Sequence, residues 1–86
     1  MKQTGLQETL QAVQLLIAEQ TGNDLEEVHP DAQLEDELNI SLTEFSQIVR
    51  RINVQFGVSL NPREIHEEVE TVLELATAVY DEQELG

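Results

Sequence analysis

The chain has 86 residues, of which 18 are acidic and four are basic, and its formal net charge at pH 7 is −14. A chain of this length supplies one hydrophobic core, so we expect a single domain over residues 1–86, ordered from about residue 4 to about residue 80. The charge repels nucleic-acid phosphates and anionic lipid headgroups and attracts basic protein surfaces. We therefore expect protein partners, with no nucleic-acid binding and no membrane insertion, and a monomer.

Cysteine is absent from the sequence. Without thiols there is no disulfide framework, thiolate metal site or cysteine nucleophile, which fits a reducing compartment. We find neither a signal-peptide pattern nor an apolar stretch long enough to span a membrane. His29 and His66 have no partner at metal-ligand spacing, and the acids of residues 24–37 lack the EF-hand pattern. We expect a cytoplasmic protein with no metal site and no catalytic residue.

A first helix is predicted by an apolar face with helical spacing. The members of this face are Leu6, Leu10, Val13, Leu16 and Ile17. Thr4 and Gln7 have the spacing of a capping box at its start, and Gly22 is suited to its end. The periodicity is lost from Asn23 to Leu38, which predicts a long connection. We expect four apolar residues to anchor this loop, namely Leu25, Val28, Ala32 and Leu34.

A second helix is predicted by a single apolar stripe of about four turns. The residues of this stripe are Leu42, Phe45, Val49, Ile52 and Phe56. Ser41 precedes the stripe and Glu44 follows three positions later, which is the spacing of a capping box. Gly57 interrupts the pattern and predicts the end of the helix.

Two more helices are expected in the last third of the chain. Asn61 and Pro62 are typical of an N-cap and a first-turn proline, and predict a short helix. Thr71 and Glu74 form another capping box ahead of a last helix that frays from Asp81 onward. The apolar residues of that helix are Val72, Leu75, Ala76 and Val79. The only strand-like alternation is too short to pair, so the predicted fold class is all-α.

From about Leu6 to Tyr80 the sequence resembles the acyl carrier and peptidyl carrier proteins. Four stretches carry the resemblance: residues 22–28, 32–34, 48–56 and 70–76. The resemblance implies a small right-handed four-helix bundle of acyl-carrier-protein type. It has three main helices, one short helix, and a long loop between the first two helices.

The family attaches 4′-phosphopantetheine, taken from coenzyme A, to a serine at the head of the second helix. In its members an aspartate precedes that serine, and leucine or methionine follows it. Here Ser41 and Leu42 match the serine and its apolar neighbour. Asn39 stands in place of the usual glycine, and the aspartate is either replaced by Ile40 or lost through a one-residue shortening. The resemblance therefore implies that Ser41 is the attachment site.

An alignment without gaps, counted back from Phe56, gives a different result. It places Leu42 at the attachment position and Ser41 at the aspartate, so that no attachment serine remains. We prefer Ser41, because loops change length more readily than they lose a functional group. In either alignment Ser41 can act as the N-cap of the second helix.

The implied function is to carry an acyl or aminoacyl group as a thioester on a phosphopantetheine arm at Ser41. The chain would be a phosphoprotein of fatty acid, polyketide or nonribosomal peptide biosynthesis, and not an enzyme. Its partners would be a phosphopantetheinyl transferase and enzymes that load or transfer acyl groups. We expect these partners to dock on Leu42, Glu44, Arg50 and Arg51. The arginine pair departs from the acidic second helix of the family. It also fits a solvated face, or ion pairing with the acidic loop.

Two alternatives stay open. The chain could be a carrier-like acidic interaction module without an arm. The second alternative concerns the core between the second and third helices, which in the family can shelter the acyl chain. The residues that could line such a shelter here are also the expected hydrophobic core. These residues are Phe45, Val49, Ile52, Ile65 and Val72.

Overall fold

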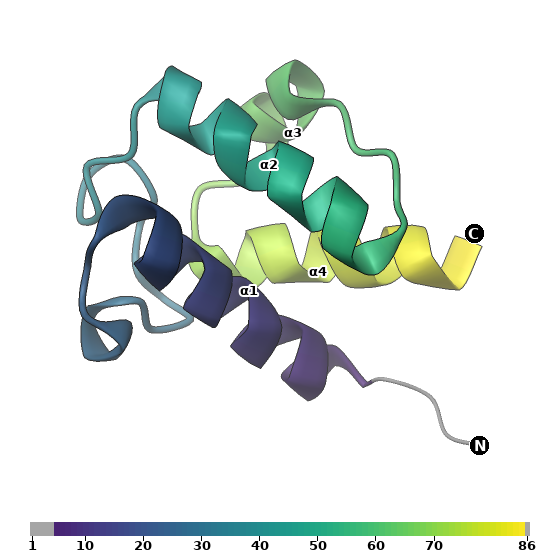
Figure 1. The fold of residues 1–86 in the computed structure, drawn as a ribbon, viewed down its shortest axis with the longest axis horizontal. Coiled ribbons are helices and arrows are strands. Elements are labelled where there is room, and N and C mark those ends of the chain that lie inside the picture. The colour runs from purple at the N-terminus through teal and green to yellow at the C-terminus, as the bar shows by residue number, and fades with distance from the viewer. Residues whose placement is uncertain (1–4, 86) are drawn as a thin grey trace.

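The computed structural model describes residues 5–85. It has the helices α1 (Leu6–Thr21), α2 (Leu42–Phe56), α3 (Pro62–Glu68) and α4 (Val72–Leu85), and a short 3₁₀ turn, η1 (Leu25–Glu27). Figure 1 shows α1, α2 and α4 packed along one another, with the short α3 beside α2. Within residues 5–85 there is no strand, only an isolated bridge between Gln33 and Thr71. The predicted all-α fold class and helix order are confirmed.

The ends of the helices follow the predicted local signals in most places. Gly22 and Gly57 end α1 and α2 with φ of 81° and 67°, a left-handed conformation that glycine adopts without steric cost. The Asn61 side chain accepts hydrogen bonds from the first backbone N–H groups of α3. At the start of α1 the predicted Thr4 lies outside the described residues, and Gly5 is the N-cap.

The hydrophobic core is mainly aliphatic, with Phe45 as its buried aromatic residue, and is drawn from all four helices and the long loop. Its largest fully buried side chains include Ile17 of α1, Phe45 of α2 and Leu75 of α4. The predicted stripe of α2 is confirmed at Phe45, Val49 and Ile52, whereas Leu42 is 48% exposed. Leu42 is the first residue of α2, and at this end of the helix its side chain lies about half in solvent.

The long loop is anchored largely as predicted. Val28, Ala32 and Leu34 are buried, but Leu25 is 53% exposed, and its predicted anchoring role was wrong. Val28 makes the contact with α1 instead, since its carbonyl accepts a hydrogen bond from the Gln14 side chain at 2.7 Å. Val28, which follows the turn as its C-cap, is therefore the buried residue here, and Leu25 lies in solvent.

The last helix is longer than expected. Fraying was predicted from Asp81 onward, yet α4 continues to Leu85. The reason is that α1 lies alongside α4 (Figure 1). The buried hydroxyl of Thr9 in α1 donates a hydrogen bond to Gln83 Oε1 at 3.2 Å, which holds the last turns in place.

Candidate functional site

Ser41 is the exposed N-cap residue of α2. Its hydroxyl oxygen accepts a hydrogen bond from the backbone N–H of Glu44 at 3.2 Å. In return Glu44 Oε1 accepts one from the Ser41 backbone N–H at 3.4 Å. The predicted capping box is therefore confirmed, and the hydroxyl lies at the positive end of the helix dipole, close to unpaired backbone donors.

The loop that leads to Ser41 is held by backbone hydrogen bonds to the segment before α4 and to the first residue of α4. The Leu34 N–H donates to the Glu70 carbonyl at 2.8 Å, and the Val72 N–H donates to the Ala32 carbonyl at 3.1 Å. Within the loop, the Ile40 N–H donates to the Leu34 carbonyl at 2.9 Å. These contacts hold the residue before Ser41 in one place, although the segment is neither helix nor strand.

Asn39 is the non-glycine residue with positive φ, at 57°, within residues 5–85. The left-handed conformation is easiest for glycine, and asparagine tolerates it better than most other residues. Asn39 is also the residue that stands in place of the family's usual glycine. This replacement is therefore compatible with the backbone that the loop requires.

Ile40 takes the place immediately before Ser41 and is only 3% exposed. Its side chain belongs to the hydrophobic core, so no carboxylate is held at this position. The nearest acid on the other side of Ser41 is Glu44, whose carboxylate is engaged in the capping box. The residue before the serine is thus apolar, and the acid that follows the serine takes part in the helix cap.

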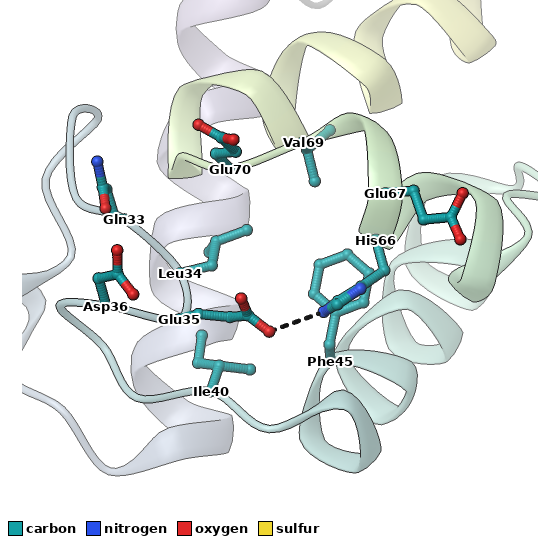
Figure 2. A pocket seen from close by; sticks show the side chains of 10 residues that line it. All are labelled: Gln33, Leu34, Glu35, Asp36, Ile40, Phe45, His66, Glu67, Val69 and Glu70. Carbon is teal, nitrogen blue, oxygen red and sulfur yellow. Dashed lines mark ion pairs between the residues drawn. The ribbon is translucent and has the colours of Figure 1, made fainter.

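A cavity of about 330 Å³ lies between the loop that precedes Ser41 and the α3 region. Figure 2 shows the loop side chains on one side and α3 with the following segment on the other. The floor of this cavity is apolar, with Leu34, Ile40, Phe45 and Val69. The rest of its wall is polar and mostly acidic: Gln33, Glu35, Asp36, His66, Glu67 and Glu70.

His66 bridges this cavity, a role that sequence reasoning missed. Its ring meets that of Phe45 edge to face, with 5.1 Å between centroids and 74° between planes. Its Nε2 lies 3.2 Å from Glu35 Oε2, across the cavity (Figure 2). The sequence contained one signal for this role. His66 follows the buried Ile65, so it lies at the edge of the buried face of α3, where a side chain is partly buried.

The five candidate liners of an acyl-chain shelter separate clearly. Phe45 lines the cavity. The other four are buried in the hydrophobic core and do not line it: Val49, Ile52, Ile65 and Val72. Their role in this structure is core packing, which leaves the cavity with a small apolar floor rather than a deep apolar tunnel.

The predicted docking residues lie in two parts of α2. Leu42 and Glu44 lie at the start of α2 beside Ser41, whereas the arginines lie near its middle. Arg51 pairs with Glu19 of α1 at 3.3 Å and donates a hydrogen bond to Gln20 at 3.2 Å. One interpretation of the arginines was ion pairing with the acidic loop, but Arg51 forms its ion pair with α1.

Within residues 5–85 no group of three or more His, Cys, Asp or Glu side chains lies close enough to hold a metal ion. The same residues contain no helix with the length and apolar character needed to cross a bilayer.

Comparison with known proteins identifies the family of the chain. The family model described as "Phosphopantetheine attachment site" matches residues 11–79, which run from α1 into α4 and include the loop and Ser41. No curated protein matches the chain. Members of this family bind 4′-phosphopantetheine covalently and are typically carriers without catalytic activity, which serve a transferase and biosynthetic enzymes. The match covers most of the chain, and the chain therefore belongs to the phosphopantetheine-attachment family of carrier domains.

Proposed function

We propose that Ser41 is the residue that carries the 4′-phosphopantetheine arm, through a phosphodiester on its hydroxyl oxygen. The observation that carries this proposal is the exposed position of Ser41 at the N-terminus of α2. A helix N-terminus favours a negatively charged phosphate, because its free N–H groups and the helix dipole both point toward it. The thiol of the arm would hold an acyl or aminoacyl group as a thioester.

The residues around Ser41 fit a bound phosphate. Before attachment, the hydroxyl oxygen accepts the Glu44 N–H, and within residues 5–85 the hydroxyl donates to no side chain or carbonyl, so its proton is free to be removed. After attachment, a phosphate oxygen can take over the Glu44 N–H. The Glu44 carboxylate would then turn toward solvent, since two negative groups repel each other at the same N-cap.

The chain itself supplies position and recognition, and we propose that all chemistry on the cargo belongs to its partners. These are a phosphopantetheinyl transferase and enzymes that load or transfer the acyl group. We further propose that residues 1–86 form one carrier domain, monomeric and cytoplasmic. Leu42 would contact the partners beside the arm, together with Glu44, Arg50 and Arg51 along α2.

The test is the intact mass of the protein after incubation with coenzyme A and a broad-specificity phosphopantetheinyl transferase. The expected result is a gain of one phosphopantetheine, located on Ser41 by peptide fragmentation and absent from Ser41→Ala. No gain, under conditions that modify an established carrier protein, would refute the proposal. A gain on another hydroxyl, such as Thr43 or Ser46, would refute the assignment to Ser41 alone.

A second function, that of a carrier-like interaction module without an arm, is favoured by Ile40. This residue is buried where the family has an aspartate next to the serine, and that acid is missing here. The two functions differ in their dependence on the hydroxyl. A Ser41→Ala protein that still performs its role in the cell would support the module, whereas loss of that role with an intact fold would support the carrier.

A further inference from the structure

The outward side of α2 bears a stripe of four exposed residues opposite the core. These are Thr43, Gln47, Arg50 and Val54. Their spacing of three and four residues places them on adjacent turns of one helical side. The stripe carries one positive charge and no negative charge, in a chain with a net charge of −14.

Arg50 and Arg51 are neighbours in sequence but differ in their surroundings. Arg51 is held against α1 by Glu19. Arg50 is exposed and forms no ion pair with the described residues 5–85. Its charge is therefore free to meet a partner, while the charge of Arg51 is already compensated within the fold.

Val54 lies one helical turn after Arg50 and is 87% exposed, more than Leu15, Leu25 or Leu42. Together with Gln55 and the two arginines it lines a shallow depression on the surface. A single exposed apolar side chain is common and needs no explanation. Here, however, it lies in a depression beside Arg50, which forms no ion pair among residues 5–85.

Charge complementarity decides what kind of surface fits this part of α2. Like charges placed opposite each other across an interface cost binding free energy, so a basic patch would be repelled by Arg50. A carboxylate opposite Arg50 would form a charge-assisted hydrogen bond with its guanidinium. An apolar side chain next to that carboxylate would cover Val54 and exclude water from the pair.

We infer that Arg50 and Val54 form a docking surface for a partner protein whose contact site has an apolar centre flanked by carboxylates. This inference deepens the docking part of the proposed function by naming the polarity of the partner. It also predicts that this stripe of α2 approaches its partner with a charge opposite in sign to the net charge of the chain. The acidic remainder then repels wrong orientations of the same partner and so helps to set the direction of docking.

The test places a photo-crosslinking residue in the full chain, as Val54→p-benzoylphenylalanine. The variant is expressed in cells of the source organism, and the cells are irradiated. The same protein is prepared with Arg50→Glu added, and with Arg63→Glu added as the matched control. Arg63 is also exposed and without an ion pair among residues 5–85, but it lies on α3. Cross-linked peptides are sequenced by mass spectrometry, and the intact mass of the same sample reports the phosphopantetheine arm.

The expected result is an adduct with another protein that falls at least tenfold with Arg50→Glu and stays within twofold with Arg63→Glu. Its cross-linked peptide should come from a surface rich in Asp and Glu. No adduct, an adduct that Arg50→Glu leaves unchanged, a peptide from a basic surface, or an adduct with a second copy of the chain would each overturn the inference.

The intact mass separates this inference from the proposed function. An arm on Ser41 without a charge-dependent adduct would remove the docking inference and leave the carrier function intact. A charge-dependent adduct on a chain without an arm would support the docking inference and refute the carrier function. The surface would then serve the interaction module.

Discussion

Replacing Ser41 by alanine tests the cap and the proposed attachment site at the same position. The change removes the hydroxyl that accepts the Glu44 N–H at 3.2 Å. Loss of a serine N-cap costs about 1 kcal/mol of unfolding free energy. In a domain of this size such a loss lowers the melting temperature by about 4–8 °C. We therefore expect Ser41→Ala to be folded, less stable than the wild type, and unmodified.

Two further variants separate stability from modification. Thr71 caps α4 with the same geometry, since Glu74 N donates to Thr71 Oγ1 at 3.1 Å and Thr71 N donates to Glu74 Oε1 at 3.3 Å. Thr71→Ala should lose about as much stability as Ser41→Ala, because both lose one N-cap hydroxyl, and should be modified normally. Ser41→Asn should keep the cap and lose the modification, because asparagine is an equally good N-cap residue.

The assays are thermal unfolding followed by circular dichroism, and intact mass after the transferase reaction. Ser41→Asn has the decisive combination, with near-wild-type stability and no arm. If Thr71→Ala also failed to gain the arm, loss of stability rather than loss of the hydroxyl would explain Ser41→Ala. If Ser41→Ala melted at the wild-type temperature, the capping argument would be refuted.

Three other predictions concern the loop, the cavity and the charge. Asn39→Ala should lower the unfolding free energy by about 1 kcal/mol relative to Asn39→Gly, because alanine pays the steric cost of positive φ that glycine avoids; equal stabilities in urea unfolding would contradict this. His66→Ala should lower the unfolding free energy by about 0.5–1.5 kcal/mol through the lost edge-to-face contact with Phe45. Glu35→Gln should lower it less, because its half-exposed ion pair is worth less than about 1 kcal/mol. The reverse order in the same assay would refute the packing argument. Added sodium chloride should raise the melting temperature, because it screens the repulsion within a chain of net charge −14; a melting temperature that is flat or falls with salt would show that this repulsion is negligible.

Features that depend on neighbours in sequence were predictable from the sequence. The capping boxes of Ser41 with Glu44 and of Thr71 with Glu74 connect residues three positions apart, so the pattern is visible without the fold. The left-handed ends at Gly22 and Gly57 are equally local. The apolar stripe of α2 identified most of its buried side because helical spacing alone decides which residues share a face.

Features that depend on contacts between distant segments were decided only by the tertiary structure. The last turns of α4 persist because α1 lies beside them and Thr9 bonds to Gln83, whereas an isolated helix end with this sequence was expected to fray. His66 became a cavity residue through Phe45 of another helix and Glu35 of the loop. Local patterns define which residues can be buried or capped, but packing decides which of them find a neighbour. For the same reason Arg51 is neutralised by α1, while Arg50, one position earlier on the helix, is left facing solvent.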